Sequence, residues 1–283
     1  GVYYMAMDYH RALNLRRVLE RLNREGLTLT TATGLFILTE VLQGLRHAHR
    51  FACDGGDVKE VIHRDVSPQN VLLTTDGDVR LIDFGIAKIM GETGLTDIGT
   101  IKGKVQYMSP EQAAGRPLDP RTDLYSLGVV SHEVFTGEML FPERDPTRVL
   151  RQIQLGDMRY SDEFDLLPPR LQRTVRRSLN RNASRRQNDA RAYREELLEV
   201  ARKDLSEYDP KSVANELGML VSSIVETPAD APEEVRLPTY FLEPCDEPPP
   251  SPGEGEPPAP FPVDDTPPAP WSPMHSLPSG QVL

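Results

Sequence analysis

Apolar residues recur every three or four positions along much of the first 225 residues, which is the period of an amphipathic helix. This spacing predicts helices over residues 15–22, 35–45, 123–136, 171–179 and 189–201. A Thr-rich stretch before the second helix supplies candidate N-cap residues. The hydrophobic pattern therefore indicates a mainly α-helical domain.

One segment instead has the pattern of a strand pair: VLLTTDGDVRLI, residues 71–82. Its two apolar runs flank Asp76-Gly77, a strong signal for a hairpin turn. Asn70 directly precedes the first run and Asp83 directly follows the second. Because the strands of a hairpin are antiparallel, we expect Asn70 and Asp83 to be neighbours at its open end.

The last part of the chain divides into a helix and a tail. Asp209-Pro210 reads as a helix start, and apolar residues at helical spacing follow it. We expect an accessory amphipathic helix in residues 206–225, docked on the domain. Residues 226–283 contain 17 of the 26 prolines, and we expect them to be extended and disordered. A P-x-x-P ligand for a partner protein is an alternative for this tail.

The net charge of −11 belongs almost entirely to that tail, which carries 11 Asp and Glu against one Arg. The other 225 residues carry 32 acidic and 31 basic residues, so the folded part shows no general nucleic-acid-binding signature. No apolar run approaches the ~20 residues that span a bilayer. Two cysteines make no disulfide framework, and a cytoplasmic location is predicted. His47, His49 and Cys53 do not have the spacing of a zinc site.

The segment VIHRDVSPQNVLL, residues 61–73, carries the candidate chemistry. Its H-R-D-x-x-x-x-N spacing is a signature of phosphoryl transfer, with Asp65 as the proton acceptor. The carboxylate of Asp83 and the amide oxygen of Asn70 suit Mg²⁺, a hard ion that prefers oxygen ligands. The alternative for each residue alone is that it caps a turn.

Further motifs follow in order: DFG at residues 83–85, SPE at 109–111, DLYSLG at 123–128, and Arg186 in NRNASRRQ. With these, residues 1–202 resemble the C-terminal lobe of a bacterial eukaryotic-like (Hanks-type) serine/threonine protein kinase. The resemblance implies a mainly α fold with a small catalytic β-hairpin. It divides the chain into a hinge remnant (1–12), the kinase lobe (13–205), the accessory helix (206–225) and the tail (226–283).

The resemblance also implies roles for single residues, with ATP and Mg²⁺ as cofactors and proteins as substrates. Asp65 would accept the proton of a Ser or Thr hydroxyl, and Asn70 and Asp83 would hold Mg²⁺. Leu72 would pack against the adenine, and the backbone of Asp8 and His10 would meet its edge, beside Met7 as gatekeeper. Structural roles are implied for His63 with Phe84, for Asp123 under the catalytic loop, and for a Glu111–Arg186 ion pair.

The chain departs from the family pattern at its start, in the H-R-D segment and in the activation segment. No Gly-rich loop, strand Lys or partner Glu precedes the hinge, so we expect a fragment that lacks the N-terminal lobe and has little activity alone. Ser67 stands where the family has Lys, and Lys104 where it has Thr. We interpret these two changes as an exchange in which Lys104 places its ammonium near Asp65. The alternative is that Lys104 points to solvent and Ser67 caps the turn.

Arg64, directly before Asp65, is suited to bind a phosphate on the activation segment. Thr93, Thr96 and Thr100 are the candidate acceptors of that phosphate, with Thr96 or Thr100 favoured. Two other function classes stay open: a pseudokinase that acts as a scaffold, and a small-molecule phosphotransferase. The presence of Asp65, Asn70 and Asp83 favours an enzyme, and the SPE segment favours protein substrates.

Overall fold

The computed structural model describes residues 4–5, 10–50, 61–84, 105–226 and 240–241. Two compact units divide the chain: one contains residues 1–6 and 238–283, and the other residues 7–237. In the first unit, strand β1 (Tyr4–Met5) pairs antiparallel with β5 (Tyr240–Phe241). β5 is a short strand inside the segment expected to be an extended, disordered tail, and the residues on either side of it lie outside the described part of the chain.

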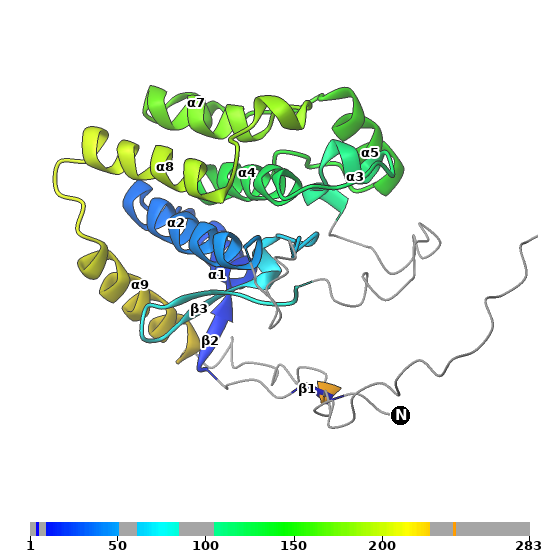
Figure 1. Cartoon of the computed structure of the whole chain (residues 1–283). Coiled ribbons are helices and arrows are strands. Elements are labelled where there is room, and N and C mark those ends of the chain that lie inside the picture. Colours follow the sequence, from blue (N-terminus) through cyan, green and yellow to red (C-terminus); the bar gives the residue numbers. More distant parts are fainter. Residues whose placement is uncertain (1–3, 6–9, 51–60, 85–104, 227–239, 242–283) are drawn as a thin grey trace, which may run out of the picture. The chain divides into compact units, whose positions relative to one another are not determined.

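The second unit is mainly helical, as the hydrophobic pattern predicts (Figure 1). Its longer helices are α1 (Leu15–Arg24), α2 (Thr31–Ala48), α4 (Arg121–Thr136), α5 (Pro146–Leu155), α7 (Pro169–Ser178), α8 (Ala190–Asp204) and α9 (Pro210–Val225). The shorter ones are α3 (Pro110–Ala113), α6 (Asp162–Asp165) and the 3₁₀ turns η1 (Pro68–Asn70), η3 (Val105–Tyr107) and η4 (Ala183–Arg185). None of the helices in these described segments is both long and apolar enough to cross a membrane.

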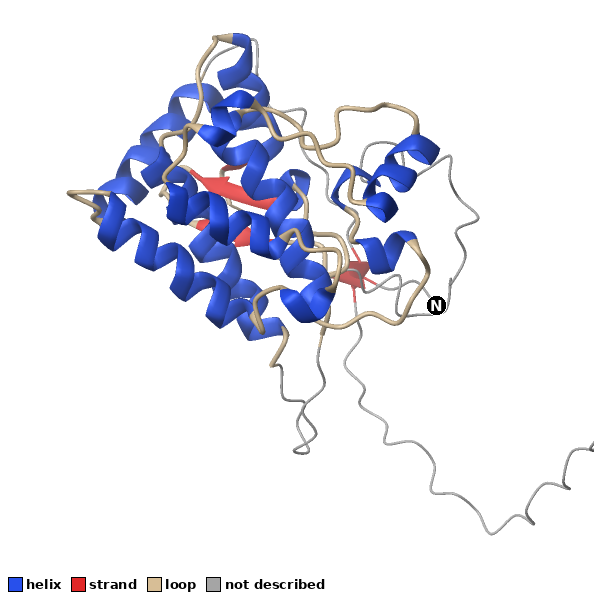
Figure 2. Cartoon of the chain, turned by 90° about the horizontal axis from the view of Figure 1, so that it is seen from above, coloured by secondary structure: helices blue, strands red, loops and turns tan. Residues whose placement is uncertain are grey.

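The predicted hairpin is present, and the structure adds a third strand to it. β3 (Val71–Thr74) pairs with β4 (Val79–Leu81) in the register Val71↔Leu81, and Gly77 adopts φ +85° in the turn. β2 (Ala12–Asn14) pairs antiparallel with the other edge of β3. The sequence pattern missed β2 because three residues are too few to show an alternation. Figure 2 shows how small the strands are among the helices.

Helix ends follow their capping residues closely. Asn14, Thr30 and Asp189 each accept a backbone hydrogen bond at the start of α1, α2 and α8. Asp209 caps α9 and Pro210 is its first residue, as the sequence predicts. These contacts satisfy N–H groups that have no partner within the helix.

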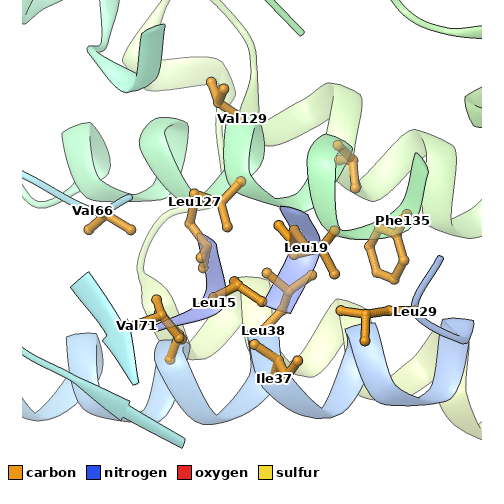
Figure 3. Close-up of a cluster of buried hydrophobic side chains, with 14 of the residues drawn as sticks. Leu15, Leu19, Leu29, Ile37, Leu38, Val66, Val71, Leu127, Val129 and Phe135 are labelled. Atoms are coloured by element: carbon orange, nitrogen blue, oxygen red, sulfur yellow. The ribbon is translucent and has the colours of Figure 1, made fainter. Parts of the chain in front are cut away.

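A single hydrophobic cluster holds α1, α2, α4 and the hairpin together (Figure 3). Leu15 and Leu19 of α1 lie between Ile37 and Leu38 of α2 and Leu127 of α4. All five side chains are buried, so each contributes about 1.5–3 kcal/mol through removal from water. This packing fixes α2 and α4, and the loop that carries the candidate site, residues 63–70, lies between these two helices in the sequence.

Helix α9 packs on the turn of the hairpin through two glycines. A Cβ on Gly77 would lie 2.1 Å from the carbonyl oxygen of Ala214, and a Cβ on Gly218 would lie 2.6 Å from that of Thr75. Backbone therefore meets backbone here, where neither side can give way by turning a side chain. The accessory helix is thus in direct contact with the element that carries the candidate site.

We expect Gly218→Leu to lower the free energy of unfolding by about 1–3 kcal/mol, because the new side chain overpacks this contact. The higher helix propensity of leucine, about 0.8 kcal/mol, works in the opposite direction. Urea unfolding measures the change, and Glu216→Leu on the exposed face of α9 is the matched control. Equal stability of the two variants would contradict a tight contact at Gly218.

Candidate active site

The segment from His63 to Asn70 is anchored at its start by the carboxylate of Asp123, which is fully buried in α4. Asp123 Oδ2 accepts the backbone N–H of His63 at 2.9 Å, and Oδ1 accepts that of Arg64 at 2.8 Å. His49 Nε2 lies 2.8 Å from the same Oδ2. Asp123 therefore anchors the loop backbone, as the resemblance implies, and His49 is a third partner that the sequence pattern did not indicate.

His63 continues this support on the other side of the loop. Its Nε2 lies 2.9 Å from the carbonyl oxygen of Ile82, and its Nδ1 accepts the N–H of Asp65 at 3.3 Å. These two bonds fit a neutral ring with the proton on Nε2. The ring also contacts that of Phe84, with centroids 4.6 Å apart. His63 thus links the Asp65 loop to the Asp83-Phe84 segment.

Burial lowers the pKa of His63 below its ordinary value, although Asp123 and the Ile82 carbonyl act in the opposite direction. The unfolded chain then binds more protons than the folded one below about pH 6.5, so stability falls as the pH falls. We expect the free energy of unfolding to decrease between pH 7 and pH 5.5. His63→Phe should flatten that slope, measured by urea unfolding at each pH, whereas an unchanged slope would contradict the lowered pKa.

Asn70 and Asp65 form the centre of the candidate site. Asn70 Nδ2 donates to the backbone oxygen of Asp65 at 2.7 Å and to its carboxylate Oδ2 at 3.0 Å. Asn70 is buried and ends η1, whereas Asp65 is partly exposed. The amide therefore fixes the direction of the Asp65 carboxylate.

Asp83 lies at the open end of the hairpin, where the sequence places it. The N–H of Ile82 donates to the carbonyl oxygen of Asn70 at 2.9 Å, which extends the ladder by one pair beyond Val71 and Leu81. Asp83 is the next residue, and its side chain is exposed. Its φ is +58°, and that of Arg64 is +65°; both are rare for residues with a side chain. Such strain, of order 1–3 kcal/mol each, is typical of functional sites.

These residues have the donor atoms that Mg²⁺ requires. Because Nδ2 of Asn70 is used by Asp65, the amide oxygen is the atom left to bind a metal ion. Among the described residues no group of three or more His, Cys, Asp and Glu could hold a metal. One carboxylate and one amide suit an ion that keeps waters and substrate phosphates as its other ligands, as Mg²⁺ does.

Within the described residues, three buried polar atoms of the same loop have no hydrogen-bond partner: Arg64 Nε, Ser67 Oγ and Gln69 Oε1. Buried polar atoms are nearly always paired, so these three atoms are exceptions to the usual pattern. Ser67 is fully buried, and its side chain forms no cap at the start of η1. Ser67 thus stands at the N-cap of η1, where its backbone oxygen accepts the N–H of Asn70 at 3.0 Å, but its side chain makes no capping bond.

The residues expected around adenine are only partly described. Leu72 is half-buried on β3 between the buried Val71 and Leu73, so it lies on the strand face away from the core. His10 is half-buried just before β2. Asp8 and Met7 lie outside the described residues.

The residues expected for the Ser67–Lys104 exchange and for regulation by phosphorylation are also only partly described. Lys104 and the three threonines Thr93, Thr96 and Thr100 also lie outside the described residues. Their roles stay predictions.

The SPE segment is joined to the catalytic loop through Gln112. Ser109 caps α3 by accepting the N–H of Gln112 at 3.2 Å, and Gln112 Oε1 accepts the N–H of Ser109 at 2.9 Å. The serine that replaces the family's alanine therefore completes a capping box. Gln112 Nε2 also donates to the carbonyl oxygen of Arg64 at 2.9 Å, a link that the sequence pattern did not indicate.

Glu111 and Arg186 form the ion pair that the resemblance implies. Two parallel bonds of 2.6 and 2.8 Å join the guanidinium to the carboxylate. Arg186 is 1% exposed, and it also donates to the carbonyl oxygens of Asn180, Arg121 and Arg181. Burial raises the pKa of Glu111, but the bonds and charge of Arg186 outweigh it and hold that pKa below its ordinary value.

A second buried cluster positions η3, the segment before SPE. Glu133 of α4 accepts bonds from Arg16 Nη1 at 2.5 Å and from the Tyr107 hydroxyl at 2.7 Å, and Arg16 also contacts that hydroxyl. Burial and the charge of Glu133 raise the pKa of Tyr107 well above its ordinary value. The cluster joins α1, α4 and η3, and sequence reasoning gave it no role because its three members are far apart in the chain.

Comparison with known proteins agrees with this geometry. The protein kinase domain model matches residues 1–203. The serine/threonine-protein kinase PknL of Mycobacterium tuberculosis is 36% identical over 166 residues, which are 58% of this chain and 40% of the relative. The tyrosine-protein kinase MasK of Myxococcus xanthus is 35% identical over 159 residues, 56% of this chain and 25% of the relative.

The serine/threonine-protein kinase PknB of Mycolicibacterium smegmatis is 31% identical over 204 residues, 70% of this chain and 30% of the relative. The chain thus spans between 25% and 40% of the length of these three relatives. The family model covers well over half of the chain, and the anchored loop, the hairpin and the buried ion pair all lie inside the matched residues. The chain belongs to the protein kinase family.

Proposed function

We propose that the protein transfers the γ-phosphoryl group of ATP to Ser and Thr hydroxyls of protein substrates. The observation that carries this proposal is the bond from the Asn70 amide to the Asp65 carboxylate at the end of the hairpin. This bond places the Asp65 carboxylate beside the Asn70 amide. Asp83 directly follows Ile82, whose N–H donates to the carbonyl oxygen of Asn70. This arrangement supports in-line transfer, in which positioning and electrostatics supply most of the catalysis.

Each residue of the site then has a defined role. Asp65 orients the substrate hydroxyl and accepts its proton, and Asn70 keeps that carboxylate in place. Asn70 Oδ1 and Asp83 would hold Mg²⁺, while Leu72 would pack against the adenine and the backbone of Asp8 and His10 would meet its edge. When bound, ATP with Mg²⁺ supplies the phosphoryl group and the positive charge that offsets the developing negative charge.

The choice of Ser and Thr rests on Pro68, which follows Ser67 as a proline does in the family's serine/threonine members. The relatives include one named as a tyrosine-protein kinase, so the acceptor must be measured. The test incubates the full-length protein with ATP labelled at the γ position and a general protein substrate, and then identifies the labelled amino acid. Label on serine or threonine supports the proposal, and label on tyrosine alone overturns this part. ATP binding without transfer would favour a scaffold instead.

Lys104 and Ser67 are proposed to share one role, with the Lys104 ammonium near Asp65. The unpartnered hydroxyl of Ser67 in the catalytic loop supports a partner at this point. We expect Lys104→Ala to lower the rate of transfer on the order of 10²-fold or more, because an electrostatic stabiliser of the transition state is lost. Steady-state kinetics of the full-length protein measures this, with Lys102→Ala as the matched control. A near-normal rate for the Lys104 variant would contradict the proposed exchange of roles between Ser67 and Lys104.

The division of the chain into hinge, kinase lobe, accessory helix and tail is part of the proposal. The packing of α9 on the hairpin turn supports an accessory role for this helix. The Pro-rich tail is proposed to bind a partner through its P-x-x-P segments. A cytoplasmic location is proposed from the presence of only two cysteines.

A further inference from the structure

A hollow with a volume of about 1190 Å³ lies beside α3, away from the Asp65 loop. α3 and α5 are neighbours in Figure 1, and the segment between α7 and α8 completes the wall. The lining side chains come from the end of the SPE motif (Pro110, Glu111), from α5 (Gln154) and from residues 180–185. We call this feature the arginine hollow, because Arg116, Arg181 and Arg185 lie in its wall.

The hollow is positively charged. Arg116, Arg181 and Arg185 are exposed, and none of them forms an ion pair within the described part of the chain. Glu111 is the one carboxylate among the lining residues, and Arg186 neutralises it through two hydrogen bonds. The local charge is therefore that of three guanidinium groups, and a concave wall concentrates such a field.

The wall is held in place before any ligand binds. The carbonyl oxygens of Asn180 and Arg181 accept bonds from the buried Arg186, at 2.7 and 3.3 Å. Gln154 Nε2 donates to the carbonyl oxygen of Ala113 at 2.7 Å, which joins α5 to α3. Because these backbones are fixed, a ligand would have to order only the arginine side chains, and this lowers the entropic cost of binding.

We propose that the arginine hollow binds an acidic or phosphorylated segment of a partner polypeptide. Arginine forks bind carboxylates and phosphates in pairs of parallel bonds, and arginine clusters recognise phosphorylated and acidic motifs. The volume exceeds the ~300–1,000 Å³ of ordinary small-molecule pockets, so it suits several residues of an extended peptide. A nucleic acid is disfavoured because the folded part is close to neutral overall.

The proposal stands on binding alone and does not depend on phosphoryl transfer. The hollow begins at Pro110 and Glu111, while the substrate hydroxyl would meet Asp65. A partner held here would contact the protein at a second point besides the Asp65 site. This second contact raises the affinity of the protein for that partner without changing the reacting groups.

The test measures binding of fluorescent 12-residue peptides to the 283-residue chain by anisotropy. The first peptide is rich in glutamate and carries a phosphothreonine. The second has the same sequence without the phosphate. The third also lacks the phosphate and has glutamine in place of glutamate, so it is neutral. We expect the first two to bind, more weakly at higher salt, and the neutral peptide not to bind. Tighter binding of the phosphorylated peptide assigns the site to phosphate, and equal binding assigns it to carboxylates.

The triple variant Arg116→Gln, Arg181→Gln, Arg185→Gln should weaken binding of the best peptide about tenfold or more. The matched control is Arg46→Gln, Arg173→Gln, Arg202→Gln, which removes three exposed arginines outside the hollow and should keep the affinity. Equal loss in both variants would show that only net charge matters and would overturn the proposal. Tighter binding of a single-stranded oligonucleotide with the same charge as the best peptide would also overturn the proposal. Circular dichroism checks folding, and Arg116→Gln alone serves if the triple variant unfolds.

Discussion

We expect Asp65→Asn to lower the rate of phosphoryl transfer by the full-length protein roughly 10²–10⁴-fold, the range for loss of a general base. The amide cannot accept a proton, although it has nearly the same size as the carboxylate. The bond from the side-chain amide of Asn70 to the backbone carbonyl oxygen of residue 65 stays possible, so the loop should keep its shape. The measurement is kcat with labelled ATP, together with the affinity for ATP, which should change little.

Asp78→Asn is the control for this prediction. Asp78 is an exposed acid at the hairpin turn, paired with Arg80 at 3.0 Å on the surface. Its loss removes the same charge from the hairpin that follows the Asp65 loop and should leave kcat unchanged. If Asp65→Asn and Asp78→Asn have similar kcat values, then Asp65 is not the proton acceptor and the proposed mechanism fails.

The second large effect concerns stability. We expect Arg186→Ala to lower the free energy of unfolding by about 3–5 kcal/mol, because Glu111 is left as an unpaired, largely buried charge. Three backbone carbonyls lose their donor at the same time. Urea unfolding of the chain measures the change. A loss below about 1 kcal/mol would contradict the pair as the main support of the SPE segment.

Two further variants separate the buried pair from arginine pairs in general. Arg191→Ala removes an exposed arginine that pairs with Glu195 at 2.8 Å and should leave the free energy of unfolding nearly unchanged. Arg186→Met with Glu111→Leu removes both charges, and it should recover part of the stability lost in Arg186→Ala. Recovery would show that the unpaired carboxylate, and not only the lost side chain, causes the effect.

The helical elements were predictable because their information is local. Apolar spacing predicted α1, α2, α4, α7, α8 and α9, and capping residues marked several of their starts. The short helices α3 and α6 and the helix α5 were not predicted, because four to ten residues give a weak period. β2 was missed for the same reason.

The candidate site was predictable to the extent that it lies on one hairpin and one loop. Asn70 and Asp83 flank two paired strands, so the sequence alone made them neighbours. The ordered motifs added Asp123 and the Glu111–Arg186 pair through resemblance. His49, Gln112 and the Arg16–Tyr107–Glu133 cluster carried no such signal, since their partners are 26 to 117 residues away.

The sequence by itself indicated the candidate residues for the chemistry and most of the segments that are helical, because periodicity, caps and turn residues act over a few positions. Only the tertiary structure decided how the loop is held: a buried aspartate accepts three donors from two other segments, and two glycines bring α9 against the hairpin turn. It also decided that Ser67 is buried, with a hydroxyl that has no hydrogen-bond partner in the described part of the chain, and that three arginines share one hollow. Burial and close approach depend on which distant segments pack together, and no local pattern states that.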